Sequence, residues 1–168
     1  ILGPTVSKKE TGEEYKSVIH KYSTDDNGFS QRRHIISSGS CIPTTVLKDV
    51  GFMNSSMFID YVDYEWCWRA EANGYICGIT DKIHICHKVG KRELSIGKYK
   101  VIISSPFRYF YQYRNYLWLI REKYVPLQWK IATGVKFLSR LVYFPLCVKG
   151  GSKCWKYMIK GIIQGIKK

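Results

Sequence analysis

Residues 58–69 read FIDYVDYEWCWR and place three carboxylates, Asp60, Asp63 and Glu65, within six positions among apolar and aromatic side chains. Burial against such side chains disfavours a charged carboxylate, which raises its pKa and suits it to act as a base near neutral pH. The same stretch also fits the start of a helix that runs to about Asn73. Asp60 or Asp63 would then cap the helix, and Glu65 would lie in its first turn, where the helix dipole favours an acid. The residues alone leave both interpretations open, and the two are compatible.

The segments around this stretch predict an α/β fold. Strands are expected at residues 1–6, 34–43, 75–80 and 82–87. Helices are expected at residues 44–50, ended by Gly51, and at residues 63–73, ended by Asn73-Gly74. The polar stretches 7–31 and 90–104 are expected to be loops. Small residues at positions 37–40 interrupt the strand at 34–43, either for the close approach of a ligand or for packing against a helix.

The C-terminal third of the chain predicts basic, amphipathic helices. Ser105 as N-cap and Pro106 at the first helical position predict a helix over residues 106–124. Further helices are expected at residues 129–148 and 154–168. Pro145 and the internal cations make the second unsuited to crossing a bilayer, and the last is expected to lie on a membrane surface.

The positive charge is concentrated in the same third. The 168 residues include 27 Lys and Arg against 13 Asp and Glu. Residues 105–168 hold 13 basic residues and one acid, a net charge of +12, which leaves +2 for residues 1–104. We therefore expect an anionic membrane surface as a partner. We expect no nucleic-acid partner, because no recognition motif is present and the apolar periodicity favours burial in lipid or protein.

Cysteine and histidine usage bears on compartment and metal binding. Six cysteines without a C-x-x-C pair predict reduced, buried thiols in a cytoplasmic protein. His87 follows an apolar run and is expected at a strand end, where ligands bind in α/β sheets. Taken alone, it is either a structural histidine or a metal ligand.

Four motifs together resemble one enzyme family in their order and spacing. They are Ser38-Gly39-Ser40, the stretch 58–69, Gly74-Tyr75 and residues 87–90. They resemble the C-terminal half of inverting, metal-dependent glycosyltransferases of family two, and are most similar to bacterial rhamnosyltransferases. The resemblance implies a GT-A fold, in which a Rossmann-like nucleotide-sugar half and an acceptor half share one sheet. We therefore expect residues 1–104 to form a partial GT-A sheet on the acceptor side, and residues 105–168 to form a helical, membrane-associating region.

The resemblance also implies roles for individual residues. Asp63 corresponds to the catalytic base, and His87 to a histidine that completes a site for Mg²⁺ or Mn²⁺. The family's Glu-Asp pair reads Val62-Asp63 here, so Glu65 or Asp60 would supply the second carboxylate.

Other residues are expected at the substrates: Ser38, Gly39, Ser40, Asp60, Trp66 and Arg69. Trp66 and Trp68 would offer a stacking surface for a sugar or fill the core. Arg69 lies four positions after Glu65, a spacing that predicts an ion pair.

The family's upstream D-x-D segment, which binds the donor, has no counterpart outside Asp25-Asp26 and the Asp60 region. We therefore expect a donor-binding half to be absent or on another chain. Completed by that half, the protein would transfer L-rhamnose from dTDP-rhamnose to a lipid-linked or polysaccharide acceptor, as in O-antigen synthesis, at the inner face of the cell membrane. A homo-oligomer is a further option. The alternative is a non-catalytic remnant that binds membranes.

Overall fold

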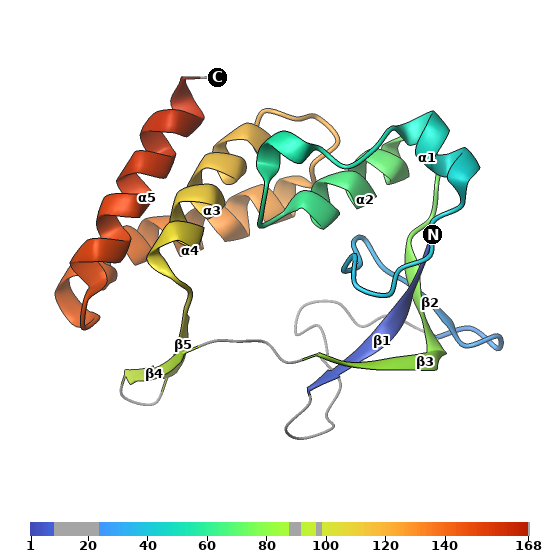
Figure 1. Ribbon diagram of the computed structural model, residues 1–168, viewed down its shortest axis with the longest axis horizontal. Coiled ribbons are helices and arrows are strands. Elements are labelled where there is room, and N and C mark those ends of the chain that lie inside the picture. Colours follow the sequence, from blue (N-terminus) through green and yellow to red (C-terminus); the bar gives the residue numbers. More distant parts are fainter. Residues whose placement is uncertain (9–23, 88–91, 97–98, 168) are drawn as a thin grey trace. The chain divides into compact units, whose positions relative to one another are not determined.

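The structure is a computed structural model that describes residues 1–8, 24–87, 92–96 and 99–167 (Figure 1). Part of the predicted loop at 7–31 and residues 88–90 of the fourth motif lie outside the described residues. The mixed α/β class is confirmed, while the relation to the GT-A fold stays a prediction.

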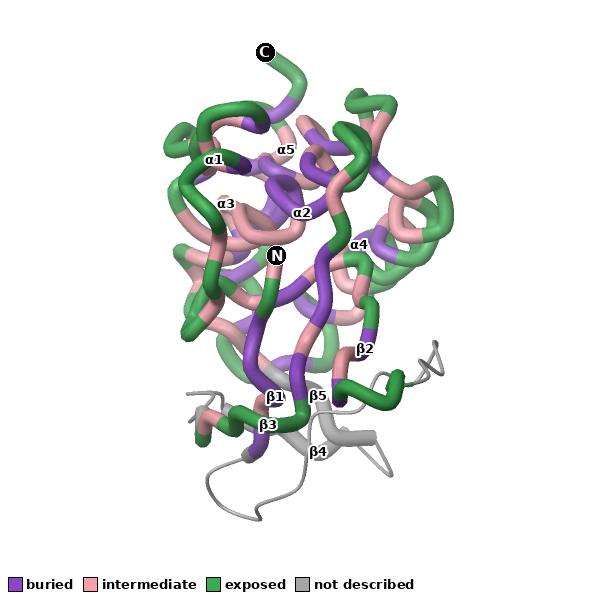
Figure 2. The backbone as a smooth tube through the Cα atoms, turned by 90° about the vertical axis from the view of Figure 1, so that its right-hand side faces the viewer, coloured by how far each residue is buried: buried purple, intermediate pink, exposed green. Residues whose placement is uncertain are grey.

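A three-stranded sheet brings together strands from the beginning and the end of residues 1–87. Its strands are β1 (Leu2–Lys8), β2 (Phe29–Gln31) and β3 (Gly78–His87), in the order β1-β3-β2. β1 is parallel to β3, whereas β2 is antiparallel to it. Leu2, the first residue of β1, is exposed, whereas the next three residues of the strand are buried (Figure 2). The hydroxyl of Thr5 donates to the carbonyl of Thr80 at 2.7 Å, which satisfies a buried polar group.

Helices α1 (Thr44–Val50) and α2 (Val62–Ala72) form the crossover between these parallel strands. The bounds of α1 are those predicted. α2 ends at Ala72, and Gly74, two residues further on, has a φ of +85°, which suits glycine. The amide of Gly74 donates to Glu71 and that of Tyr75 to Ala70, each at 3.0 Å. This Schellman pattern satisfies the last carbonyls of the helix, as the Asn73-Gly74 pair predicted.

The core of this region is built around α2. Seven buried residues pack together: Ile35, Val46, Val50, Trp66, Cys67, Ala70 and Cys77. The six cysteines are free thiols, as predicted. Cys67, Cys77 and Cys154 are buried, but Cys41, Cys86 and Cys147 are exposed, so burial was predicted correctly for half of them.

Four strand and loop predictions were wrong. The stretch 7–31, expected to be a loop, contains the end of β1 and all of β2. Residues 34–43 form a loop with a single bridge, Cys41 to Leu2, because a turn at 37–40 reverses the chain. Residues 78–87 form one strand instead of two, and a register shift opposite Pro4/Thr5 absorbs the residues around Asp81. The expected loop at 90–104 contains a hairpin of β4 (Arg92–Ile96) and β5 (Tyr99–Ile103).

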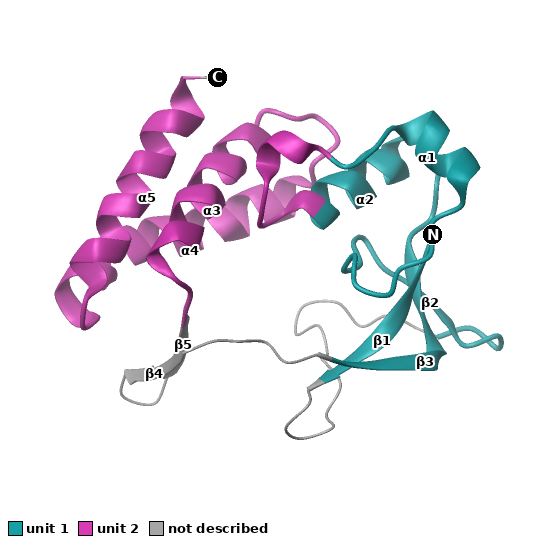
Figure 3. Cartoon of the chain, viewed as in Figure 1, with its two compact units in different colours: residues 1–53, 63–90 teal, residues 54–62, 91–168 magenta. Residues whose placement is uncertain are grey.

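The chain divides into two units (Figure 3). Unit 1 comprises residues 1–53 and 63–90, and unit 2 comprises residues 54–62 and 91–168. The predicted functional division at residue 104 stays a prediction, since these units are defined by packing alone.

Unit 2 is a bundle of α3 (Pro106–Leu119), α4 (Leu127–Cys147) and α5 (Gly151–Ile166), together with a short 3₁₀ turn, η1 (Ser55–Met57). Its core is aromatic and includes Tyr109, Tyr113, Phe137, Phe144 and Met158. α3 ends before the predicted residue 124. Within the described part of the chain, none of the helices has the length and apolar character of a membrane span.

Candidate functional site

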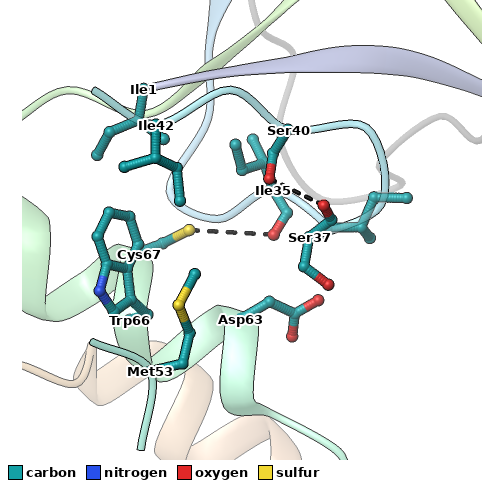
Figure 4. Close-up of a pocket in the computed structure, with 10 residues that line it drawn as sticks. Ile1, Ile35, Ser37, Ser40, Ile42, Met53, Asp63, Trp66 and Cys67 are labelled. Carbon is teal, nitrogen blue, oxygen red and sulfur yellow. Dashed lines mark hydrogen bonds between the residues drawn. The ribbon is translucent and has the colours of Figure 1, made fainter. Parts of the chain in front are cut away.

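Unit 1 contains a pocket that joins several of the predicted site residues (Figure 4). The space inside it that water-sized spheres can occupy is about 10 Å³, and the 220 Å³ of empty volume around it includes open solvent. The lining residues are Ile1, Ile35, Ile36, Ser37, Ser40, Ile42, Met53, Asp63, Trp66 and Cys67. The pocket is therefore mainly apolar, with one carboxylate and two hydroxyl groups.

A tight turn forms the polar side of the pocket. The amide and the hydroxyl of Ser40 both donate to the carbonyl of Ser37, at 3.2 and 2.9 Å. Gly39 has a φ of +72°, and a Cβ there would lie 3.1 Å from the ring of Pro4. The small residues thus let this turn approach β1. Ser38 and Gly39 are exposed on the turn, and Ser40 lines the pocket.

Asp63 is the carboxylate of the pocket. It is half-buried in the first turn of α2, where one of its oxygens accepts from the amide of Tyr64 at 3.1 Å. Figure 4 shows the side chains of Asp63 and Ser37 pointing toward one another. α2 begins at Val62, so Asp63 and Glu65 occupy its first turn and neither Asp60 nor Asp63 is at the cap position.

Glu65 and Arg69 form the predicted ion pair. The two guanidinium nitrogens Nε and Nη2 donate to the two carboxylate oxygens at 2.7 and 3.2 Å. Arg69 also donates to the carbonyls of Val50 and Phe52, the latter at 2.9 Å. Glu65 is buried and occupied by this pairing. The geometry therefore favours a structural role for the pair, which fixes α2 to the segment after α1. The catalytic role of Glu65 and the substrate role of Arg69 stay predictions.

Trp66 and Trp68 lie in the interior, each with 1% of its surface exposed. The indole of Trp66 donates to the carbonyl of Gly51 at 2.7 Å. Neither ring presents a face on which a sugar could stack, so core packing, the alternative that the sequence left open, accounts for the position of both rings, and a substrate role for Trp66 stays a prediction. Trp66 still forms part of the pocket wall.

Asp60 belongs to unit 2, where a network of mostly part-buried hydrogen bonds holds the segment before α2. Its carboxylate accepts two hydrogen bonds from Arg108, one of them at 3.1 Å. The same contact raises the pKa of Arg108. The side-chain amide of Asn115, fully buried, donates to the carbonyls of Met57, Ile59 and Asp60 at 2.9, 2.9 and 3.0 Å.

This segment adopts a strained backbone. Phe58, Asp60 and Tyr61 have φ values of 60°, 65° and 68°, in a region that L-residues rarely occupy. Each such residue costs about 1–3 kcal/mol and persists where surrounding contacts fix it, often near functional sites. The sequence did not identify Arg108 or Asn115, which lie on α3 and contact this segment across about 50 positions of sequence.

The predicted metal site is not assembled by the described residues. His87 ends β3, where its backbone lies opposite Lys8, and its side chain is outside what the structure describes. In the described ranges, no three His, Cys, Asp or Glu side chains come together in a way that could hold a metal ion. The metal role of His87 stays a prediction.

Comparison with known proteins gives one similarity of interest. Over 132 residues the chain is 34% identical to a Shigella flexneri protein named dTDP-rhamnosyl transferase RfbF. The chain is similar to a rhamnosyltransferase. The match covers 79% of this chain but only 45% of that relative, so the chain spans less than half of its length. No family model matches. No solved structure matches either.

This similarity confirms the predicted likeness to a bacterial rhamnosyltransferase. Membership of family two, the GT-A fold and the correspondence to the C-terminal half stay predictions.

Proposed function

We propose that this chain is the acceptor-side part of a glycosyltransferase that moves L-rhamnose from dTDP-rhamnose to a hydroxyl of a lipid-linked or polysaccharide acceptor. The similarity to a dTDP-rhamnosyl transferase supports the donor and the reaction class. The observation that carries the proposal is the pocket in which Asp63 meets the turn of Ser37 and Ser40. Those two motifs are separated in sequence, and folding brings them together.

Asp63 is the base in the proposed reaction. The acceptor hydroxyl attacks the anomeric carbon from the face opposite the nucleotide, and its proton passes to the Asp63 carboxylate. The new carbon–oxygen bond forms as the bond to the diphosphate breaks, and dTDP leaves with the electron pair, which inverts the configuration. The half-buried carboxylate beside apolar walls supports this role. Glu65 and Asp60 are neutralised by Arg69 and Arg108, and they serve in the proposal to hold α2 and the segment before it.

Donor binding is proposed to need more than this chain. Mg²⁺ or Mn²⁺ would neutralise charge on the diphosphate in the complete enzyme, with His87 as one ligand. The described residues do not assemble a ligand set for this ion. The nucleotide-binding half would lie outside this chain.

The decisive experiment is Asp63→Asn in the complete enzyme. Removal of a general base lowers turnover by roughly 10²–10⁴-fold. Donor binding and the unfolding midpoint should be retained. The matched control is Glu71→Gln, which neutralises an exposed acid on the same helix and should leave turnover unchanged. Turnover by Asp63→Asn within a few-fold of wild type would show that Asp63 is not the base.

A second candidate is a membrane-binding protein without catalytic activity. The net charge of +12 in residues 105–168 favours it, because that charge has no role in the chemistry above. If the complete protein transfers no rhamnose and Asp63→Asn leaves all measured properties unchanged, this second function replaces the first.

A further inference from the structure

We propose that α4 lies in the surface of an anionic bilayer, with one row of its apolar side chains inserted below the headgroups. Six residues make up this row, called here the α4 stripe: Leu127, Ile131, Val135, Leu138, Val142 and Leu146. Their exposed fractions range from 59% to 79%. Spacings of three and four positions place all six on one side of the helix.

The opposite side of α4 already has its packing partners. Thr133, Phe137 and Phe144 are buried there. The ring of Phe137 stacks on Tyr113 with centroids 4.3 Å apart, and its carbonyl accepts from the Tyr113 hydroxyl at 2.8 Å. α4 is thus apolar on two sides, and the bundle covers only one. A helix with this pattern needs a second apolar environment.

The α4 stripe is long and continuous, as expected of a helix face that lies in a membrane surface. Its six side chains follow the helix from Leu127 to Leu146, a rise of roughly 28 Å at 1.5 Å per residue. Isolated exposed apolar residues are ordinary, but contiguous rows mark contacts with other molecules or with membranes.

Charge identifies the occupant as an anionic bilayer. Residues 105–168 hold 13 basic residues and a single acid, and Lys153, Lys156 and Lys160 are exposed on α5 beside α4. Trp155 of α5 is partly exposed and donates its indole proton to the carbonyl of Leu141 at 3.1 Å. An apolar row with basic and tryptophan neighbours is the composition of helices that bind anionic lipid surfaces.

An in-plane orientation suits the charges on α4 itself. Lys130, Lys136 and Arg140 lie within the helix and would enter hydrocarbon if the helix crossed the bilayer. With α4 parallel to the surface, Lys130 and Lys136 stay outside the hydrocarbon, and Arg140 keeps its place over the rings of Tyr109 and Phe137 in the bundle.

From the sequence, membrane contact is predicted for the last helix. In the structure, α5 uses Cys154, Met158, Gly161 and Gly165 to pack within the bundle. A side chain at Gly161 would collide with the Phe110 carbonyl, so α5 lies close against α3. α4 therefore provides the larger free apolar row. This proposal does not depend on the transferase activity.

The test is co-sedimentation of the purified protein with vesicles. Vesicles of mixed phosphatidylglycerol and phosphatidylcholine should bind the wild type, and pure phosphatidylcholine or 0.5 M salt should weaken binding several-fold. The double variant Ile131→Gln/Leu138→Gln should lose at least about tenfold in partition coefficient. The control is Ile76→Gln/Ile83→Gln, which removes two side chains of unit 1 that are each 56% exposed. It should bind as the wild type does.

Several outcomes would overturn the proposal. The wild type could fail to bind anionic vesicles, or the stripe and control variants could bind equally. Light scattering could also show a wild-type dimer that the stripe variant dissociates without any change in vesicle binding, which would make the stripe a contact between copies. If circular dichroism shows that the double variant is unfolded, Leu146→Gln, at the 79% exposed end of the stripe, replaces it with the same expected direction.

Discussion

Tyr64 follows Asp63 in α2, and the pKa of its hydroxyl depends on the burial and the charge beside the pocket. Its ring stacks on His34 with centroids 3.8 Å apart. Burial, followed by the charge of Asp63, raises the pKa of Tyr64 to about 12. The folded pKa exceeds the unfolded value of about 10, so this contribution to stability is complete below about pH 10 and is lost as the pH rises toward 12. Over that pH interval, the free energy of unfolding measured in urea should therefore fall less steeply for Tyr64→Phe than for the wild type. Parallel slopes would contradict this.

The acids of residues 58–69 show how far the sequence could specify the site. The Glu65–Arg69 pair was predictable, because four positions on a helix bring side chains together. The partner of Asp60 was not, since Arg108 lies 48 positions away and no local pattern connects them. Distinguishing the pocket acid Asp63 from Asp60 and Glu65 therefore rested on the family resemblance, and the residues alone did not decide it.

At the level of elements, α3 is the support of the segment that leads into α2. Asn115 satisfies three carbonyls of that segment, and Arg114 donates to the carbonyls of Ser56 and Met57 at 2.7 and 3.2 Å. Asn115→Ala leaves those three acceptors, one buried and two partly buried, without this donor, and we expect the free energy of unfolding to fall by about 2–4 kcal/mol. Chemical denaturation measures this change in the free energy of unfolding. Gln164→Ala, an exposed change on α5, should stay within about 0.5 kcal/mol. A loss below about 1 kcal/mol for Asn115→Ala would refute this role.

Element boundaries were predictable where the signals are local. α1 and the end of α2 were predicted correctly because Gly51 and Asn73-Gly74 stop a helix wherever it packs. Residues 34–43 were assigned as a strand from their β-branched side chains, but strand formation also needs a pairing partner, and only Cys41 has one. The β4–β5 hairpin was missed although Gly97-Lys98 separates its two runs, a two-residue spacing typical of hairpins.

At the scale of the whole molecule, the proposal that the donor half lies outside this chain predicts weak nucleotide binding by the chain alone. The chain corresponds to 45% of its relative, and the proposed donor half lies outside it. We expect titration calorimetry of dTDP with Mg²⁺ to give a Kd above about 1 mM for this chain alone. Such a Kd corresponds to a binding free energy weaker than about 4 kcal/mol. A longer protein that includes the donor half should bind at least about 100-fold more tightly. Micromolar binding by the chain alone would place donor recognition within these residues.

The pairing of β1 with β3 sets the order in which unit 1 can be completed during synthesis. Thr5 and Thr80 meet in the sheet although 75 positions separate them. A nascent chain therefore exposes β1 and the apolar side of α2 until β3 has left the ribosome, and long-range closure of this kind is slow. Until then these surfaces are accessible to other chains, and translation that stops before Gly78 yields a product in which β1 has no parallel neighbour.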